Sequence, residues 1–247
     1  MTEEKTYIYG KHAVAEAVLY APHCVREVYL SPTVDDTLLR EKIKKAGIML
    51  VSLNSKNKPK GISDEAVHQG AIASIVLDNL LVSYNNFIKN LDLSKKPALV
   101  LLDELQDPQN VGAIIRSAVA FGISGVLIPQ HNQVGITATV IKVSAGMVFR
   151  IPIINIGNIN NTLEDLKKTS FWIYGLEGEG QNSLTEEKFG EPTVFVLGSE
   201  GKGIRLKTKE HCDILLSIPV TPECESLNVA TSAGVVFYEW KKQQTPI

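Results

Sequence analysis

Apolar residues follow two different patterns along the 247-residue chain, and the change of pattern predicts two α/β domains. In the first part, short apolar segments alternate with charged ones. Residues 11–19 carry an apolar stripe at helical spacing, and residues 35–46 have the pattern of a charged surface helix that stops at Gly47. The predicted strands are residues 25–30, 48–53 and 70–76. We therefore expect residues 1–77 to form a small α/β domain.

Nearly continuous apolar segments begin after Pro97 and are typical of strands that are covered on both faces. They are residues 98–103, 125–128, 151–156, 171–176, 193–197 and 214–220. Helical segments lie between several of them, and an amphipathic helix over residues 227–242 follows the last. Strands that alternate with helices favour a mostly parallel sheet with helices on its faces. We expect the polar, Asn-rich residues 78–96 to be a linker and residues 97–247 to be the second domain.

Composition narrows the class of protein. Apolar residues make up 44% of the chain and charged residues 21%, which is typical of a soluble globular protein. The chain shows neither a secretory signal nor the run of about 20 apolar residues that crosses a bilayer. We therefore expect a cytoplasmic protein without a membrane partner. The three cysteines, Cys24, Cys212 and Cys224, form no close pair, so neither a disulfide framework nor a metal site is indicated.

Net charge is less favourable for a nucleic-acid binder, because such proteins usually carry a basic surface and this chain is at −2. The charge is uneven. Residues 1–76 hold ten Lys and Arg against nine Asp and Glu, which gives +1 and leaves −3 for the rest. A loop at residues 54–64 contributes three lysines to this balance. Such a cluster is either a solvated face or an RNA contact, and the sequence leaves both open.

Three loops contain polar residues beyond the carboxyl ends of predicted strands, where open parallel sheets bind their ligands. The first, residues 103–110, precedes a helix that we expect Asn110 to cap and Gly122 to end. Arg116 lies off the buried stripe of this helix. By itself, this segment is also consistent with an ordinary capped helix that carries a solvated arginine.

The second loop is a glycine-rich turn, Gly198–Gly203, directly after a strand. It has neither the GxxxxGK[ST] spacing of a P-loop nor the GxGxxG spacing of a dinucleotide site. Glu200 inside the turn disfavours a phosphate, so a neutral or cationic ligand fits better. The third loop, residues 218–229, leads into the last helix, and either Ser226 or Asn228 is placed to cap it.

Taken in this order, the three loops resemble the three motifs of the SpoU (TrmH-like) family of RNA 2′-O-ribose methyltransferases. The motifs are Asn110 with Arg116, then Leu197–Gly203, then Ser226–Asn228, and the resemblance covers about residues 97–242. It implies a SPOUT-type parallel α/β domain with a trefoil knot, which assembles as a homodimer through this C-terminal domain.

The N-terminal part adds to the resemblance. Tyr9–Val14 and His68–Gly70 are similar to segments of the small, ribosomal-protein-L30e-like RNA-binding domain of the RlmB-type subgroup. That subgroup methylates a guanosine in 23S ribosomal RNA, which implies a ribosomal RNA substrate here. One segment departs from the family: several relatives carry a small residue and an acidic residue after the position of Gly146, where this chain has Met147–Arg150.

The resemblance also implies the chemistry and its residues. S-adenosylmethionine would bind in the knotted crevice and its methyl group would pass directly to a ribose 2′-hydroxyl, without a protein nucleophile or a metal. The residues implied at the reacting centre are Asn110, Arg116, Glu200, Ser226 and Asn228. Those implied to bind the cofactor are Leu197, Gly198, Ile218, Pro219 and Leu227. We expect RNA to contact Lys56, Lys58, Lys60 and Arg116.

Two roles for Arg116 are compatible with this reaction. In the family's mechanism the arginine accepts the proton of the hydroxyl, but at pH 7 the deprotonation of a guanidinium costs about 7–8 kcal/mol. Alternatively, Arg116 stays charged, binds the adjacent RNA phosphate and stabilises the developing alkoxide. The sequence leaves both roles open.

Other functions compete with rRNA methylation. One is 2′-O-methylation of transfer RNA, and another is a non-catalytic RNA-binding module on the same fold. The joint presence of Asn110, Arg116, Glu200 and Ser226 disfavours the non-catalytic module. A third is an enzyme that binds a nucleotide phosphate at Gly198–Gly203, which Glu200 disfavours.

Overall fold

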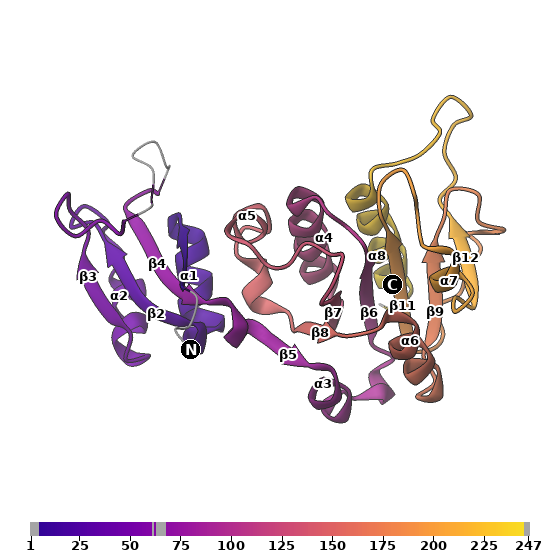
Figure 1. The fold of residues 1–247 in the computed structure, drawn as a ribbon, viewed down its shortest axis with the longest axis horizontal. Coiled ribbons are helices and arrows are strands. Elements are labelled where there is room, and N and C mark those ends of the chain that lie inside the picture. The colour runs from indigo at the N-terminus through magenta and orange to yellow at the C-terminus, as the bar shows by residue number, and fades with distance from the viewer. Residues whose placement is uncertain (1–4, 61, 63–67, 245–247) are drawn as a thin grey trace. The chain divides into compact units, whose positions relative to one another are not determined.

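The computed structural model describes residues 5–60, 62 and 68–244, and it divides into two compact units (Figure 1). The first unit runs to Leu81 and also contains Ile136–Arg150. The second contains Val82–Gly135 and the chain from Ile151 onward. The domain boundaries expected from the sequence stay a prediction.

The first unit is built on a four-stranded sheet in the order β1-β4-β2-β3. Its strands are β1 (Lys5–Tyr9), β2 (Val25–Leu30), β3 (Met49–Ser52) and β4 (Ala71–Val76). The flanking strands β1 and β2 run antiparallel to β4, and β3 runs parallel to β2. The pattern of residues 5–9 predicted no strand, because in this edge strand only Ile8 is buried and the alternation is weak.

Among the residues that the structure describes, three α-helices and three short 3-10 helices belong to this unit. They are α1 (Lys11–Tyr20), α2 (Thr37–Lys45), α5 (Ala138–Val143), η1 (Pro22–Cys24), η2 (Leu77–Leu80) and η4 (Met147–Arg150). The two helices predicted near the N-terminus are confirmed. Asp36 caps α2 by accepting a hydrogen bond from Leu39 N at 2.9 Å, and Gly47 follows with a positive φ of 67°.

The two N-terminal sequence motifs meet in the first unit. Gly10 N donates to Ala71 O at 3.0 Å, and Lys11 N donates to Gln69 Oε1 at 3.3 Å. Gly70 has a φ of +74°, and a Cβ at this position would lie 2.7 Å from Val34 Cγ2. Only glycine fits such a position without strain.

The segment that departs from the family pattern packs on α1. The Arg150 guanidinium forms an ion pair with the Glu16 carboxylate through two hydrogen bonds, and its centre lies 4.1 Å from the Tyr20 ring centroid. Gly146, with a φ of +80°, lies so close that an added Cβ would be 2.8 Å from Glu16 Cβ. Residues 136–150 are therefore part of the first unit's packing, although they lie between two strands of the second.

The second unit contains an eight-stranded sheet in the order β10-β12-β9-β11-β6-β7-β8-β5. The strands are β5 (Leu81–Ser83), β6 (Ala98–Asp103), β7 (Gly125–Pro129), β8 (Ile153–Ile156), β9 (Trp172–Leu176), β10 (Asn182–Ser183), β11 (Thr193–Gly198) and β12 (Ile214–Ser217). Every pairing from β10 to β8 is parallel. The expected parallel α/β sheet is confirmed. The trefoil knot stays a prediction, since strand pairing does not trace how the chain threads its loops.

Helices cover both faces of this sheet. They are α3 (Tyr84–Asn90), α4 (Pro108–Phe121), α6 (Ile159–Lys168), the short α7 (Leu206–Lys209) and α8 (Val229–Gln244), with a 3-10 turn η3 (Leu93–Lys95). Leu99 and Leu101 pack with α6 on one face, together with Tyr84 and Phe87 of α3. On the other face Phe195 lies against Phe237 of α8, and α4 packs beside α8 (Figure 1). Residues 78–96, which the sequence indicates as a linker, contain β5 at the edge of the large sheet and α3, which packs against the core beneath it.

The prediction that Asn110 caps the helix after β6 is wrong. The helix α4 begins at Pro108, and the capping residue is Asp107, whose Oδ1 accepts from Gln109 N at 2.9 Å. Proline has no N–H and a fixed φ, so it is favoured at the first helical position and moves the cap to the residue before it. Asn110 instead lies inside the first turn, where it is buried. The predicted end at Gly122 is confirmed, with a φ of +78°.

No helix in the described part of the chain is both long enough and apolar enough to span a membrane.

Candidate functional site

A cavity of about 560 Å³ opens in the second unit at the carboxyl ends of β9, β11 and β12. Its volume is typical of a small-molecule site. The lining residues come from four segments: 176–179, 197–203, 216–220 and 225–232. Two of the three loops singled out from the sequence thus line one cavity, because the carboxyl ends of neighbouring parallel strands share one edge of the sheet.

The turn Gly198–Gly203 forms one wall of the cavity. Ser199 and Gly203 exchange backbone hydrogen bonds of 3.1 and 2.8 Å, which closes the turn on itself. A Cβ on Gly198 would lie 2.1 Å from the carbonyl carbon of Gly203. No side chain fits at Gly198, and Gly201 and Gly203 have positive φ angles of 79° and 65°. The glycines are therefore required by the fold of the turn, and they expose backbone to the cavity.

Three polar residues, one from each sequence motif, form a hydrogen-bond network. Glu200 Oε1 accepts from Asn110 Nδ2 at 2.7 Å and from Asn228 Nδ2 at 2.8 Å. Asn228 Nδ2 also donates to Asn110 Oδ1 at 2.9 Å. Because these residues lie 90 and 118 positions apart from Asn110, the network ties the start of α4, the glycine-rich turn and the start of α8 to one another.

Asn228 also caps the last helix. Its Oδ1 accepts from Ala230 N at 2.9 Å and from Thr231 N at 3.3 Å. This confirms one of the two capping residues expected from the sequence. The bonds fix the orientation of the amide, because Oδ1 faces the helix and Nδ2 is left to donate to Glu200 and Asn110.

The charge of the cavity is negative. Its lining includes Glu177, Glu179, Glu200 and Glu225, and none of its lining residues within the described chain is Lys, Arg or His. One of the four is partly compensated from outside, since Lys209 Nζ lies 2.5 Å from Glu177 Oε2. A cationic or neutral ligand fits this environment, and a phosphate does not, because it would face carboxylates without a cation to offset its charge.

Sequence reasoning missed Glu177 and Glu179. They lie in the segment Leu176-Glu-Gly-Glu-Gly180, directly after β9. A signal was present, because this segment is a second glycine-rich turn at the carboxyl end of a predicted strand. What the sequence did not show is that β9 is the neighbour of β11, which places the two turns side by side.

The structure brings most of the expected site residues together. Leu197, Gly198, Ile218 and Leu227 line the cavity, as do Glu200, Ser226 and Asn228. Asn110 reaches the site through its bonds to Glu200 and Asn228. Pro219 is not among the residues that line the cavity, and its expected contact with the cofactor stays a prediction.

Arg116 is exposed on α4 and is not part of the cavity wall. Among the described residues, none forms a hydrogen bond or an ion pair with it. In the first unit, Lys56 and Lys60 are exposed and Lys58 is half-buried. The structure contains no RNA, so the expected contacts of these four residues stay predictions.

Within the described residues, no group of three or more His, Cys, Asp and Glu side chains is arranged to hold a metal ion.

Two family models match the chain. The SpoU rRNA Methylase family model matches residues 97–238, and the model for RNA 2′-O ribose methyltransferase substrate binding matches residues 7–79.

Similar proteins match nearly the whole chain. A 23S rRNA (guanosine-2′-O-)-methyltransferase RlmB of Neisseria meningitidis is 36% identical over 239 residues, which are 96% of this chain and 95% of the relative. The RlmB of Xylella fastidiosa is 37% identical, and the alignment covers 99% of each chain. Among solved structures, the SpoU methyltransferase AviRb of Streptomyces viridochromogenes in complex with AdoMet has a TM-score of 0.77 at 19% identity, over 97% of this chain and 90% of that one. This last similarity supports the fold alone.

Proposed function

Because the chain belongs to the SpoU rRNA methylase family, we propose that it methylates the ribose 2′-hydroxyl of a guanosine in 23S ribosomal RNA, with S-adenosylmethionine as the methyl donor. The observation that carries the proposal is the carboxylate-lined cavity at the turn Gly198–Gly203. The two RlmB relatives, which act on a 23S rRNA guanosine by name, align with nearly the whole chain.

The donor set of the cavity fits S-adenosylmethionine. When bound, this cofactor supplies an electrophilic methyl group on a positively charged sulfur. Four carboxylates and no basic residue line the cavity in the described chain, which favours a cation. The apolar side chains of Leu197, Ile218 and Leu227 offer the packing that an adenine needs, and the backbone beside Gly198 offers hydrogen-bonding groups.

The network of Asn110, Glu200 and Asn228 holds the site in place. Each of the three side chains is hydrogen-bonded to the other two. We infer that they act mainly by fixing the loops around the cofactor, because a rigid arrangement of binding groups lowers the cost of aligning the reactants. Ser226, which is exposed at the rim of the cavity, is placed to contact the ribose.

For Arg116 we favour the role of a cation. The side chain is exposed and has no hydrogen-bond partner among the described residues, so it is available to an RNA phosphate. A role as base would require the removal of a proton at a cost of about 7–8 kcal/mol, which a charge role avoids.

The substrate, assembly and location complete the proposal. The N-terminal domain, which the substrate-binding model matches, supplies RNA affinity and choice of site, and it reads RNA shape rather than sequence. We further propose that the chain acts in the cytoplasm as a homodimer that forms through the C-terminal domain.

A methyl-transfer assay tests the function. The full chain is incubated with tritiated S-adenosylmethionine and either unmodified 23S rRNA or transfer RNA, and the labelled nucleotide is mapped. We expect label on a guanosine ribose of 23S rRNA. Label on transfer RNA alone would contradict the substrate, and cofactor binding without transfer to either RNA would favour the non-catalytic module.

Two Arg116 variants separate its roles. Arg116→Ala is expected to abolish turnover and to leave cofactor affinity within a few fold, because the residue lies outside the cavity wall. Arg116→Lys keeps the charge, so substantial remaining activity supports a charge role. Near-normal turnover of the alanine variant would contradict both roles.

The lysine loop of the small domain has its own test. Replacement of Lys56, Lys58 and Lys60 by Ala is expected to weaken RNA binding and to reduce its salt dependence by up to about three phosphate contacts. A matched control replaces three lysines of α2, Lys42, Lys44 and Lys45, with the same change of charge. Equal affinity and equal salt slope in the loop variant and the parent would show that the loop is merely solvated.

A further inference from the structure

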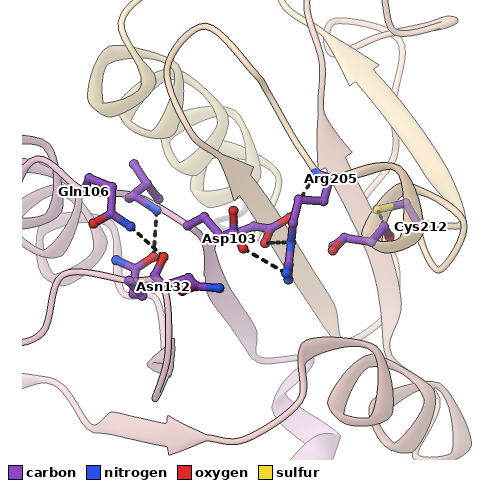
Figure 2. Close-up of polar contacts among 9 residues, drawn as sticks. Asp103, Gln106, Asn132, Arg205 and Cys212 are labelled. Atoms are coloured by element: carbon purple, nitrogen blue, oxygen red, sulfur yellow. Dashed lines mark hydrogen bonds and ion pairs between the residues drawn. The ribbon is translucent and has the colours of Figure 1, made fainter.

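A buried carboxylate lies next to the cofactor cavity and takes no part in the network described above. Asp103 is the last residue of β6 and is fully buried. Its Oδ1 accepts from Arg205 Nε at 2.7 Å, and its Oδ2 accepts from the backbone N–H of Arg205 at 3.1 Å (Figure 2). Both oxygens are thus committed to one residue 102 positions away. A buried charge is tolerated only when it is paired and hydrogen-bonded in this way.

The pair holds both ends of the turn Gly198–Gly203. At the start of the turn, Gly198 is the neighbour of Asp103 in the register of β11 and β6. At its end, Arg205 follows Gly203 by two residues, with the buried Ile204 between them. Asp103 therefore lies beside the residue that enters the turn and is hydrogen-bonded to the residue that leaves it.

Arg205 also fixes the loop that leads from β6 to α4. Glu104, which follows Asp103, has a φ of +61° and accepts a hydrogen bond from Arg205 Nη1 at 3.0 Å. The next residue, Leu105, donates from its N to Gln133 Oε1 at 2.8 Å. The guanidinium of Arg205 thus bridges two consecutive carboxylates at the exit of β6. The turn that carries Glu200 and the loop that precedes Asn110 are anchored at one point.

We propose that Asp103 and Arg205 form a positioning pair that keeps the turn Gly198–Gly203 in the conformation that binds the cofactor. This inference rests on the proposed function, since it assigns S-adenosylmethionine to the cavity. Arg205 is a positioning residue and not a cofactor contact, because it acts through the turn and does not line the cavity.

The geometry distinguishes this role from an RNA contact. Arg205 belongs to a basic cluster with Lys202, Lys207 and Lys209, and its side chain is 45% exposed. Its Nε and Nη1, however, are directed to Asp103 and Glu104. Within this cluster, Lys207 is exposed and matches Arg205 in charge, so it is the control for a change of surface charge alone.

The experiment measures the turn and the cofactor separately, on the full chain. Hydrogen–deuterium exchange without any ligand follows the amides of Ser199 and Gly203, and calorimetry gives the Kd of S-adenosylmethionine. The variants are Arg205→Ala, Arg205→Lys and the control Lys207→Ala. Lysine keeps the charge and the backbone bond but lacks the planar fork that bridges two carboxylates, so it is the variant that folds if alanine does not.

We expect Arg205→Ala to speed exchange in the turn and to raise the cofactor Kd, each about tenfold or more, because the apparent affinity falls with the fraction of molecules in the binding conformation. Arg205→Lys is expected to have a smaller effect in the same direction. Added methylguanidine should partly restore the affinity of Arg205→Ala. The KM for RNA and the exchange rate within β11 should stay within twofold of the parent, and Lys207→Ala should match the parent throughout.

Several outcomes would overturn the inference. One is a lower melting temperature with unchanged cofactor affinity and unchanged exchange in the turn, which would indicate a purely structural pair. Another is a raised KM for RNA with an unchanged cofactor Kd, which would make Arg205 an RNA contact. If the parent does not bind S-adenosylmethionine, the proposed function fails, but the exchange measurement still tests whether the pair holds the turn.

Discussion

Replacement of Glu200 by Ala should loosen the network that joins the three motifs. The change removes the acceptor of two hydrogen bonds, at 2.7 Å from Asn110 Nδ2 and 2.8 Å from Asn228 Nδ2. The two donors differ in what replaces the bond. Asn228 is exposed, so water can hydrogen-bond to its amide, whereas Asn110 is 7% exposed and its N–H would be left without a partner.

The magnitude follows from the buried donor. A hydrogen bond to a charged group contributes about 1.5–3 kcal/mol, and a buried donor left unpaired costs about as much. We therefore expect Glu200→Ala to lower the free energy of unfolding by about 2 kcal/mol. Glu200→Gln keeps an oxygen that can accept both bonds, so its cost should be about 1 kcal/mol or less.

Urea denaturation of the two variants and the parent measures these differences, provided that the slope of the transition is unchanged. Calorimetry with S-adenosylmethionine then shows whether the loosened loops bind the cofactor more weakly, with the alanine variant affected more than the glutamine variant. If the free energy of unfolding of Glu200→Ala lies within about 0.5 kcal/mol of the parent's, the network does not hold the loops together.

Three further predictions concern packing, thiols and pH. Gly146→Ala should lower the free energy of unfolding by about 2 kcal/mol, because Gly146 has a φ of +80° and an added Cβ would lie 2.8 Å from a neighbouring side chain. The control Gly157→Ala should leave the free energy of unfolding nearly unchanged in the same urea assay, because nothing lies within 4 Å of the added Cβ. Burial raises the pKa of the Cys24 thiol to about 11 and that of the half-buried Cys212 thiol to about 12. Mass spectrometry should therefore show both thiols labelled by iodoacetamide at pH 8 far more slowly in the native chain than in urea. Equal rates would contradict the burial of Cys24 and the partial burial of Cys212. The hydrogen bond from the backbone N–H of Leu39 and the ammonium of Lys11 lower the pKa of Asp36, which caps α2. The contribution of this cap to the free energy of unfolding, about 1 kcal/mol, is therefore present above about pH 4 and is lost as the pH falls further. Asp36→Ala should therefore cost stability at pH 7 and much less at pH 3, and a cost independent of pH would contradict the cap.

The sequence alone determined the elements whose signal is local. The strand β6 was predicted with its observed bounds, and β11 within one residue, because strands buried on both faces are nearly continuous apolar runs. The end of α4 at Gly122 followed from the glycine that the left-handed conformation favours. The cap of α4 was misjudged, although a local signal was present in Pro108, because the polar residue of the motif was given more weight than the proline that precedes it.

Tertiary structure alone decided which loops share a site and what charge they bring. Glu177 lines the cavity because β9 lies beside β11, an adjacency that no spacing along the chain encodes. The partner of the buried Asp103 is 102 residues away, and the partner of Arg150 is 134 residues away in the other direction. The periodicity of apolar residues shows which face of a helix or strand is buried, but it does not show which element packs against that face. The identity of the neighbour depends on the packing of the whole chain, because the hydrophobic effect that drives this packing has no direction of its own.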